Sequence, residues 1–166
     1  MGGGKKTGQR VVHDPVSTRK GGCKAKINPL SDKEIEYLAK FLKIDGFRGV
    51  FMRDTLPAKR REKECFVLNL DDSSGEGTHW VSCRVEKDEC YYFDPIGDVL
   101  PPPELIRYLD PLLIYYNDER LQEPFDDEPL CGHLATLILS EQSQGHLYPN
   151  ILTRYGKQAI ALRRSS

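Results

Sequence analysis

The sequence predicts an α+β domain in which a central buried helix packs on a mixed or antiparallel β-sheet. Residues 132–140 are apolar on nearly every side, a pattern typical of a helix at the centre of a domain. Residues 65–70 form a compact apolar run suited to a buried strand. Two further segments, Trp80–Val85 and Cys90–Phe93, flank a short polar turn and predict an antiparallel hairpin.

The first predicted element is a helix that begins after Ser31. Ser31 and Glu34 have the spacing of a capping box, in which each side chain bonds the backbone N–H of the other residue. Apolar side chains then recur at helical spacing, at Ile35, Leu38, Phe41 and Leu42. We expect this helix to end near Lys43 and residues 47–57 to form an irregular or edge segment.

Two more elements are predicted between the hairpin and the buried helix. Three prolines, Pro101–Pro103, begin a helix that carries Leu105 and Leu109, since proline is well tolerated in the first turn of a helix. Residues 112–116 predict a further short strand.

The chain divides into a basic leader and one folded domain. Residues 1–28 are Gly-rich and carry seven Lys or Arg against one Asp, a net charge of +6, whereas residues 29–166 carry a net charge of −7. Such a leader is typical of a flexible tail that touches nucleic acid or an acidic partner. Residues 29–166 are enough for a single domain, and a chain with 39% hydrophobic and 30% charged residues is expected to fold.

Membrane and secreted classes do not fit the sequence. No apolar run approaches the roughly 20 residues that span a bilayer, and the N-terminus lacks the apolar stretch of a secretory signal. The cysteines are too few and too irregular for a disulfide framework, and their odd number leaves at least one thiol free: Cys23, Cys65, Cys83, Cys90 and Cys131. We therefore expect an intracellular, reducing compartment.

A histidine, a carboxylate and a cysteine follow one another along the chain as His79, Asp94 and Cys131. A thiol becomes a nucleophile when a base removes its proton, and a histidine held by a carboxylate commonly does this. In the predicted hairpin the first strand starts where the second stops, so His79 and Asp94 should meet at one end of the sheet. Asp94 would then bind one imidazole nitrogen and leave the other to take the thiol proton.

Cys131 stands at the head of the predicted buried helix. The unpaired N–H groups and the dipole of a helix N-terminus lower the pKa of a thiol. Gly132 beside it would let the backbone approach a substrate carbonyl closely. The backbone N–H of Cys131 and the side-chain amide of Gln122 are candidate donors of an oxyanion hole.

Other interpretations of the same residues remain open at this point. His79 and Cys131 would each also suit a packed structural role. The side chains of four residues could in principle form a zinc site: His79, Cys83, Cys90 and His133. Their spacing is poor for zinc and the chain has no Cys-x-x-Cys pair, so we expect no metal. Cys83 and Cys90 face each other across the predicted turn, where they could pair or pack in the core.

One set of motifs carries a resemblance to a known family: residues 66–70, 75–80 and 91–97, Gln122, and Cys131-Gly132. In this order and spacing they resemble the adenovirus-type cysteine endopeptidases. These enzymes are relatives of the SUMO-specific proteases and also occur in other DNA viruses and in virus-like DNA transposons. The resemblance covers roughly residues 31–155 and implies a papain-like, SUMO-protease-like fold for a protease domain at 29–166.

The resemblance also implies roles for individual residues. His79 would be the general base, Asp94 the carboxylate that orients it, and Cys131 the nucleophile. Gln122 would complete the oxyanion hole, and Trp80 would shield the imidazole from solvent. The implied reaction is cleavage of peptide bonds after Gly-containing sites in viral or element-encoded structural precursors, as in virion maturation.

Partners and location follow from the same resemblance. The chemistry needs no cofactor, although a peptide or DNA activates the adenovirus enzyme, and the leader at residues 1–28 could contact nucleic acid weakly. The nucleus or the virion is the implied location, with no membrane association. Two alternatives remain: a protease for a ubiquitin-like modifier, or a catalytically silent binding domain of the same fold.

Overall fold

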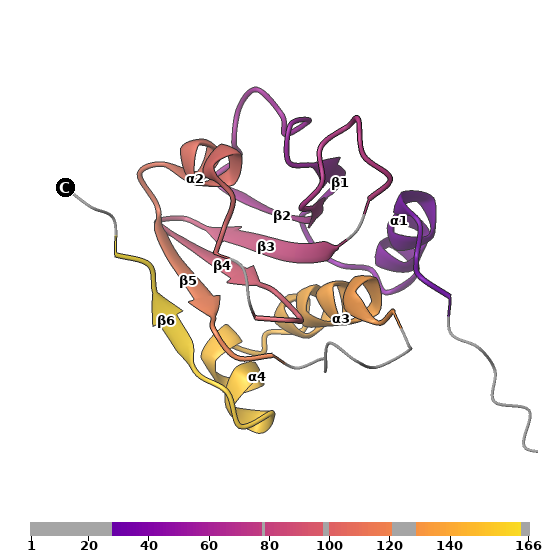
Figure 1. The fold of residues 1–166 in the computed structure, drawn as a ribbon. Helices are drawn as coiled ribbons and strands as arrows, with labels where there is room; N and C mark the ends of the chain where they lie inside the picture. Colours follow the sequence, from indigo (N-terminus) through magenta and orange to yellow (C-terminus); the bar gives the residue numbers. More distant parts are fainter. Residues whose placement is uncertain (1–27, 78, 98–99, 121–128, 164–166) are drawn as a thin grey trace, which may run out of the picture.

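A computed structural model describes residues 28–77, 79–97, 100–120 and 129–163 of the chain. Within these ranges the chain forms four helices and six strands (Figure 1). Their order is α1 (Asp32–Phe41), β1 (Phe47–Met52), β2 (Lys63–Asn69), β3 (Trp80–Glu86), β4 (Glu89–Phe93), α2 (Pro103–Leu109), β5 (Leu113–Asn117), α3 (Cys131–Ser143), α4 (Tyr148–Arg154) and β6 (Ala159–Ala161).

The six strands form one mixed sheet in the order β1-β2-β3-β4-β5-β6. The pairs β1–β2 and β4–β5 are parallel, and the other three pairs are antiparallel. A mixed sheet with helices is compatible with the predicted α+β class, and the central helix on a mixed sheet is confirmed. The expected leader, residues 1–28, lies outside the described residues apart from its last residue.

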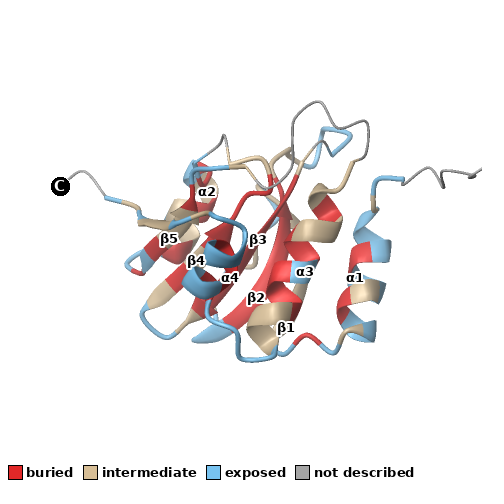
Figure 2. Ribbon diagram, turned by 90° about the horizontal axis from the view of Figure 1, so that it is seen from below, coloured by how far each residue is buried: buried red, intermediate tan, exposed pale blue. Residues whose placement is uncertain are grey.

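Helices cover both faces of the sheet. Figure 2 shows α1, α3 and α4 lying over the same face, with their buried sides turned toward the strands. The opposite face is covered by α2, whose Leu105 and Leu109 are buried against it. Because side chains alternate along a strand, Phe66 of β2 packs toward α2 while Val67 packs toward α1 and α3. This double burial explains why β2 is an apolar run without alternation.

The capping box at the start of α1 forms as predicted. The Ser31 hydroxyl accepts a hydrogen bond from Glu34 N at 3.2 Å, and the Glu34 carboxylate accepts one from Ser31 N at 2.8 Å. The helix ends at Phe41, two residues before the predicted limit at Lys43. The chain thus enters the domain through a fixed turn at Ser31.

The predicted hairpin is also confirmed. Strands β3 and β4 pair antiparallel from Ser82 opposite Phe93 to Glu86 opposite Glu89. The start of β3 therefore lies beside the end of β4, which brings the segments that contain His79 and Asp94 to the same edge of the sheet.

The first part of residues 47–57 is β1, an edge strand with an irregular register between Phe47 and Gly49, as the expected irregular or edge segment implied; it pairs parallel with β2. Two segments, α4 and β6, have no predicted counterpart. The helix has seven residues and the strand only three, too few for an apolar period to stand out, and β6 exists because it pairs with β5.

No helix in the described part of the chain is long and apolar enough to cross a membrane.

Candidate active site

His79 and Asp94 meet at the end of the β3–β4 hairpin. Nε2 of His79 lies 2.5 Å from Oδ1 of Asp94, and their side chains are 13% and 0% exposed. The Asp94 carboxylate thus engages the Nε2 side of the ring. This contact sets the orientation of the ring and leaves the other nitrogen, Nδ1, for a second partner.

The backbone holds both residues in place. Leu70 N donates a 3.0 Å hydrogen bond to the carbonyl of His79, which extends the β2–β3 ladder past the end of the strands. Ile96 N donates to Oδ1 of Asp94 at 2.9 Å, so this carboxylate oxygen accepts from the backbone as well as from the ring. The geometry of the pair therefore follows from the hairpin and the turn after it.

Asn117, at the end of β5, holds the main chain of Asp94. Its Oδ1 accepts from Asp94 N at 2.8 Å, and its Nδ2 donates to Asp94 O at 2.6 Å and to Glu119 O at 3.0 Å. Asn117 is 1% exposed. Asn117 is not among the site residues predicted from the sequence. The signal that could have found it is an asparagine directly after the predicted strand at residues 112–116, but its use depends on the parallel pairing of β4 with β5, which local patterns do not reveal.

Cys131 is the first residue of α3, as the helix prediction implied. Its sulfur lies close enough to the imidazole of His79 and to the backbone N–H groups of Trp80 and Gly132 for these groups to lower the thiol pKa. The structure thus brings His79, Asp94 and Cys131 together in one contiguous chain of contacts.

These contacts shift both titrating groups in the direction that favours an ion pair. Burial opposes ionisation of the Cys131 thiol, but the hydrogen bond and positive charge of His79 and the two backbone N–H groups outweigh it and lower the thiol pKa. Burial also opposes protonation of His79, yet its hydrogen bonds to Asp94 and Cys131 raise its pKa to about 9. Both shifts favour transfer of the thiol proton to the imidazole.

The other described cysteines differ from Cys131. Burial raises the pKa of Cys65 to about 11 and raises that of Cys83 well above its ordinary value. The Sγ atoms of Cys83 and Cys90 lie 2.7 Å apart, and both thiols are free and buried in the core between the sheet and α2. Among the described cysteines, a lowered thiol pKa is thus found at Cys131, the residue next to His79.

Gly132 and Trp80 pack against each other beside the thiol. A Cβ on Gly132 would lie 3.1 Å from Cδ1 of Trp80 and 3.3 Å from Cβ of Leu30, so a larger residue fits here only if one of these neighbours moves by a few tenths of an ångström. The expected role of Gly132 was an approach to substrate; its observed close contact is internal. Trp80 is 9% exposed and donates from Nε1 to Leu30 O at 3.0 Å. The predicted shielding of the imidazole by Trp80 stays a prediction.

Of the two predicted donors to an oxyanion, only the backbone N–H of Cys131 belongs to the described residues. Gln122 lies outside the described residues, as do the acidic residues that follow it, so its predicted role stays untested. The backbone N–H of Cys131 begins α3, where intrahelical partners are lacking. This N–H remains the candidate donor.

A cleft of about 580 Å³ opens beside Cys131. The segment before α1, the end of β1 and the loop between β2 and β3 enclose it. Its lining consists of Pro29, Leu30, Ser31, Asp32, Met52, Ser73, Gly75, Glu76, Gly77, Trp80, Pro129 and Cys131. The side chain of Cys131 thus lines a cleft that is open to solvent.

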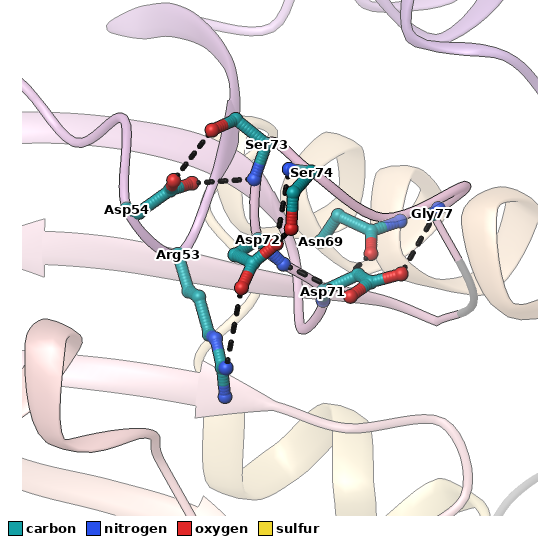
Figure 3. A network of polar contacts seen from close by, with 8 residues as sticks. All are labelled: Arg53, Asp54, Asn69, Asp71, Asp72, Ser73, Ser74 and Gly77. Atoms are coloured by element: carbon teal, nitrogen blue, oxygen red, sulfur yellow. Dashed lines mark hydrogen bonds and ion pairs between the residues drawn. The ribbon is translucent and has the colours of Figure 1, made fainter.

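The loop along this cleft is held by its own polar network, drawn in Figure 3. The Asp54 carboxylate accepts from the N and the Oγ of Ser73, at 2.8 and 2.6 Å. Asn69 Oδ1 accepts from Asp71 N at 2.9 Å, and Asp71 Oδ2 accepts from Gly77 N at 3.2 Å. The loop between β2 and β3 is thus tied at its start, its middle and its end.

Metal ligation finds no support in the described ranges, where no group of three or more His, Cys, Asp or Glu side chains is placed to hold an ion. The zinc grouping considered from the sequence is accordingly not formed.

No protein-family model matches the chain, and no curated protein matches it in sequence.

Proposed function

We propose that the protein is a cysteine endopeptidase with a papain-like, SUMO-protease-like domain at residues 29–166. The observation that carries the proposal is the chain of contacts from Asp94 through His79 to Cys131, with the thiol at the head of a helix and open to a cleft. The His79–Asp94 pair alone, or a cysteine at a helix start alone, would also suit a purely structural role. A lowered thiol pKa beside a raised imidazole pKa, however, is the combination that nucleophilic chemistry uses.

The reaction follows from the geometry. The Cys131 thiolate attacks the carbonyl carbon of the scissile peptide, and the oxygen takes up the negative charge of the tetrahedral intermediate. The backbone N–H of Cys131 and the amide of Gln122 are the proposed donors to this oxygen. The intermediate collapses to a thioester while the His79 imidazolium gives its proton to the leaving amine.

Hydrolysis of the thioester restores the resting site. Neutral His79 takes a proton from an incoming water, whose oxygen attacks the acyl carbon, and the thiolate leaves. Asp94 keeps the ring in place and stabilises its charged form throughout, without itself taking the proton. No cofactor is needed for these steps.

The proposed substrates are Gly-containing sites in viral or element-encoded structural precursors. The proposed setting is an intracellular, reducing compartment such as the nucleus or the virion, with activation by DNA or a peptide and nucleic-acid contact through residues 1–28 as further proposals. These statements rest on the sequence resemblance to the adenovirus-type enzymes.

The test is reaction with an electrophilic Gly-Gly thiol probe, followed by mass spectrometry of the labelled residue. The wild type is compared with Cys131→Ala, His79→Ala and the matched control Cys65→Ala, which removes a thiol whose pKa burial raises. We expect labelling of Cys131 that is at least about a hundredfold slower without His79 and unchanged in Cys65→Ala. Labelling that is indifferent to His79 would refute the proposal.

A further inference from the structure

The cleft beside Cys131 has an apolar floor. Leu30 and Met52 lie on it together with two prolines and the indole of Trp80. Methionine adapts its shape to different apolar partners, and the hydrogen bond from Trp80 to Leu30 O links two of these lining residues. The floor can therefore take one apolar side chain close to the nucleophile.

The rim of the same cleft is acidic. Asp32, in the first turn of α1, and Glu76, in the loop between β2 and β3, both line it and are both exposed. None of the described residues that line the cleft is Lys or Arg. An extended peptide bound at Cys131 would therefore pass two carboxylates that no described lining residue neutralises.

The two carboxylates belong to segments that are fixed before a substrate arrives. The capping box at Ser31 sets the start of α1 next to Asp32. On the other side, the bond from Gly77 N to Asp71 and those from Ser73 to Asp54 hold the loop on both sides of Glu76 (Figure 3). A rim that needs no rearrangement discriminates between partners at low entropic cost.

We propose that this cleft selects peptides in which a Lys or Arg side chain lies near an apolar one beside the scissile bond. Asp32 and Glu76 would pair with the cationic side chain, and the apolar lining around Met52 and Trp80 would bind the apolar one. The inference rests on the proposed protease function. It narrows the proposed substrates to those glycine-containing sites that also carry a Lys or Arg nearby. Charge complementarity at the rim carries it.

Binding of short peptides to the Cys131→Ala protein tests the selection apart from catalysis. The probes are fluorescent eight-residue peptides with a central Leu-Gly-Gly in an alanine host, each with one Lys or one Glu at a single position. Fluorescence anisotropy should show one position at which the Lys peptide binds about fivefold more tightly than the Glu peptide at low salt, near the upper range for exposed ion pairs. The difference should shrink in high salt.

Substitutions at the rim identify the residues responsible. Glu76→Gln should reduce the preference for Lys about threefold, and Glu76→Lys should reverse it toward Glu. Asp32→Asn should act in the same direction as Glu76→Gln. The matched control is Glu36→Lys, because Glu36 is exposed on α1 but does not line this cleft. It should leave the preference unchanged.

Equal binding of Lys and Glu peptides at every position, no binding of any peptide, or a preference that Glu36→Lys alters as much as Glu76→Lys would each overturn the inference. A separate measurement tests the proposed protease function. Labelling of wild-type Cys131 by small, neutral chloroacetamide depends on His79 and not on the acidic rim. Activated labelling without charge selection would thus leave the protease proposal standing.

Discussion

The side-chain amide of Asn117 forms two hydrogen bonds with the main chain of Asp94, from Asp94 N to Oδ1 and from Nδ2 to Asp94 O. Asn117 ends β5 and Asp94 follows β4, and the two strands run parallel. The amide thus continues the ladder by one step after regular pairing stops. The carboxylate that orients His79 is thereby fixed through its backbone, and its side chain stays available to the ring.

Replacing Asn117 should misplace Asp94. Asn117→Ala leaves a buried N–H and a buried C=O without these partners, which we expect to cost about 1–3 kcal/mol of unfolding free energy. We also expect slower chloroacetamide labelling of Cys131 and a shift of its pH profile to higher pH. Urea unfolding and labelling rates across pH measure the two effects.

A control separates positioning from general destabilisation. Ile114 lies on the same strand, is 1% exposed and packs in the core on the α2 side of the sheet. Ile114→Val should cost about 0.5–1.5 kcal/mol and leave the pH profile in place. A profile shifted equally by both variants would contradict a positioning role for Asn117.

The pH dependence of labelling should report the ion pair. The lowered pKa of Cys131 means that the labelling rate of the wild type should rise with a midpoint below the ordinary thiol value of 9.0. In His79→Ala the largest favourable contact is lost while burial remains, so the midpoint should move upward. Stopped-flow labelling between pH 4 and 10 measures both midpoints, and coincident curves would contradict the assignment.

The pH dependence of stability should change when the thiol is removed. A group whose pKa is raised on folding stabilises the folded state fully below its unfolded pKa, and this contribution is lost as pH rises through the folded pKa. His79, with a folded pKa of about 9, behaves in this way. Cys131, with a lowered pKa, has the opposite dependence between its folded pKa and its ordinary value of 9.0, so over that range it offsets part of the His79 contribution in the wild type.

Cys131→Ala keeps the bond from His79 to Asp94 and removes the thiol contribution. Its unfolding free energy should therefore fall as pH rises from about 6.5 toward 9, whereas the wild type should show a flatter curve over the same range. Urea unfolding at pH 6, 7.5 and 9 measures this difference. A Cys131→Ala curve as flat as that of the wild type would mean that Asp94 alone does not raise the imidazole pKa.

Gly132 should tolerate no larger side chain. In Gly132→Ala the new methyl group meets Trp80 and Leu30 within 3.1–3.3 Å, which forces α3 or the indole to move and should cost about 1–3 kcal/mol. The sulfur of Cys131 would shift from the N–H of Trp80 as α3 moves, so labelling should slow as well.

The matched control for Gly132→Ala is Leu137→Ala, because Leu137 lies on the same helix and is 42% exposed. It should change stability by about 0.5 kcal/mol or less and leave labelling unaltered. Equal effects in the two variants would contradict a special need for glycine at residue 132.

Local patterns were enough to predict the elements that carry the pair at the end of the hairpin. The capping box at Ser31 and the strands around the turn are short-range signals, and the convergence of His79 with Asp94 follows from the hairpin alone. The position of Cys131 at the start of α3 likewise follows from the apolar run that begins there.

Long-range pairing was beyond the same reasoning. The parallel pairs β1–β2 and β4–β5 join segments that no turn connects directly, so neither the role of Asn117 nor the pairing of Phe47–Met52 with β2 could be predicted from sequence patterns. The tight contact of Gly132 with Trp80 depends on how α3 lies against the sheet, which apolar periodicity does not specify.

The hairpin has a consequence for how the site is assembled. His79 and Asp94 lie 15 residues apart and come together by a local turn, whereas Cys131 arrives on a helix made later in synthesis. Until α3 docks, the thiol keeps the ordinary reactivity of an unfolded chain, so a growing polypeptide carries no activated nucleophile that could attack its neighbours. We expect the thiol to become reactive when α3 docks, and pulse labelling of Cys131 during refolding would record that step as a rise in rate.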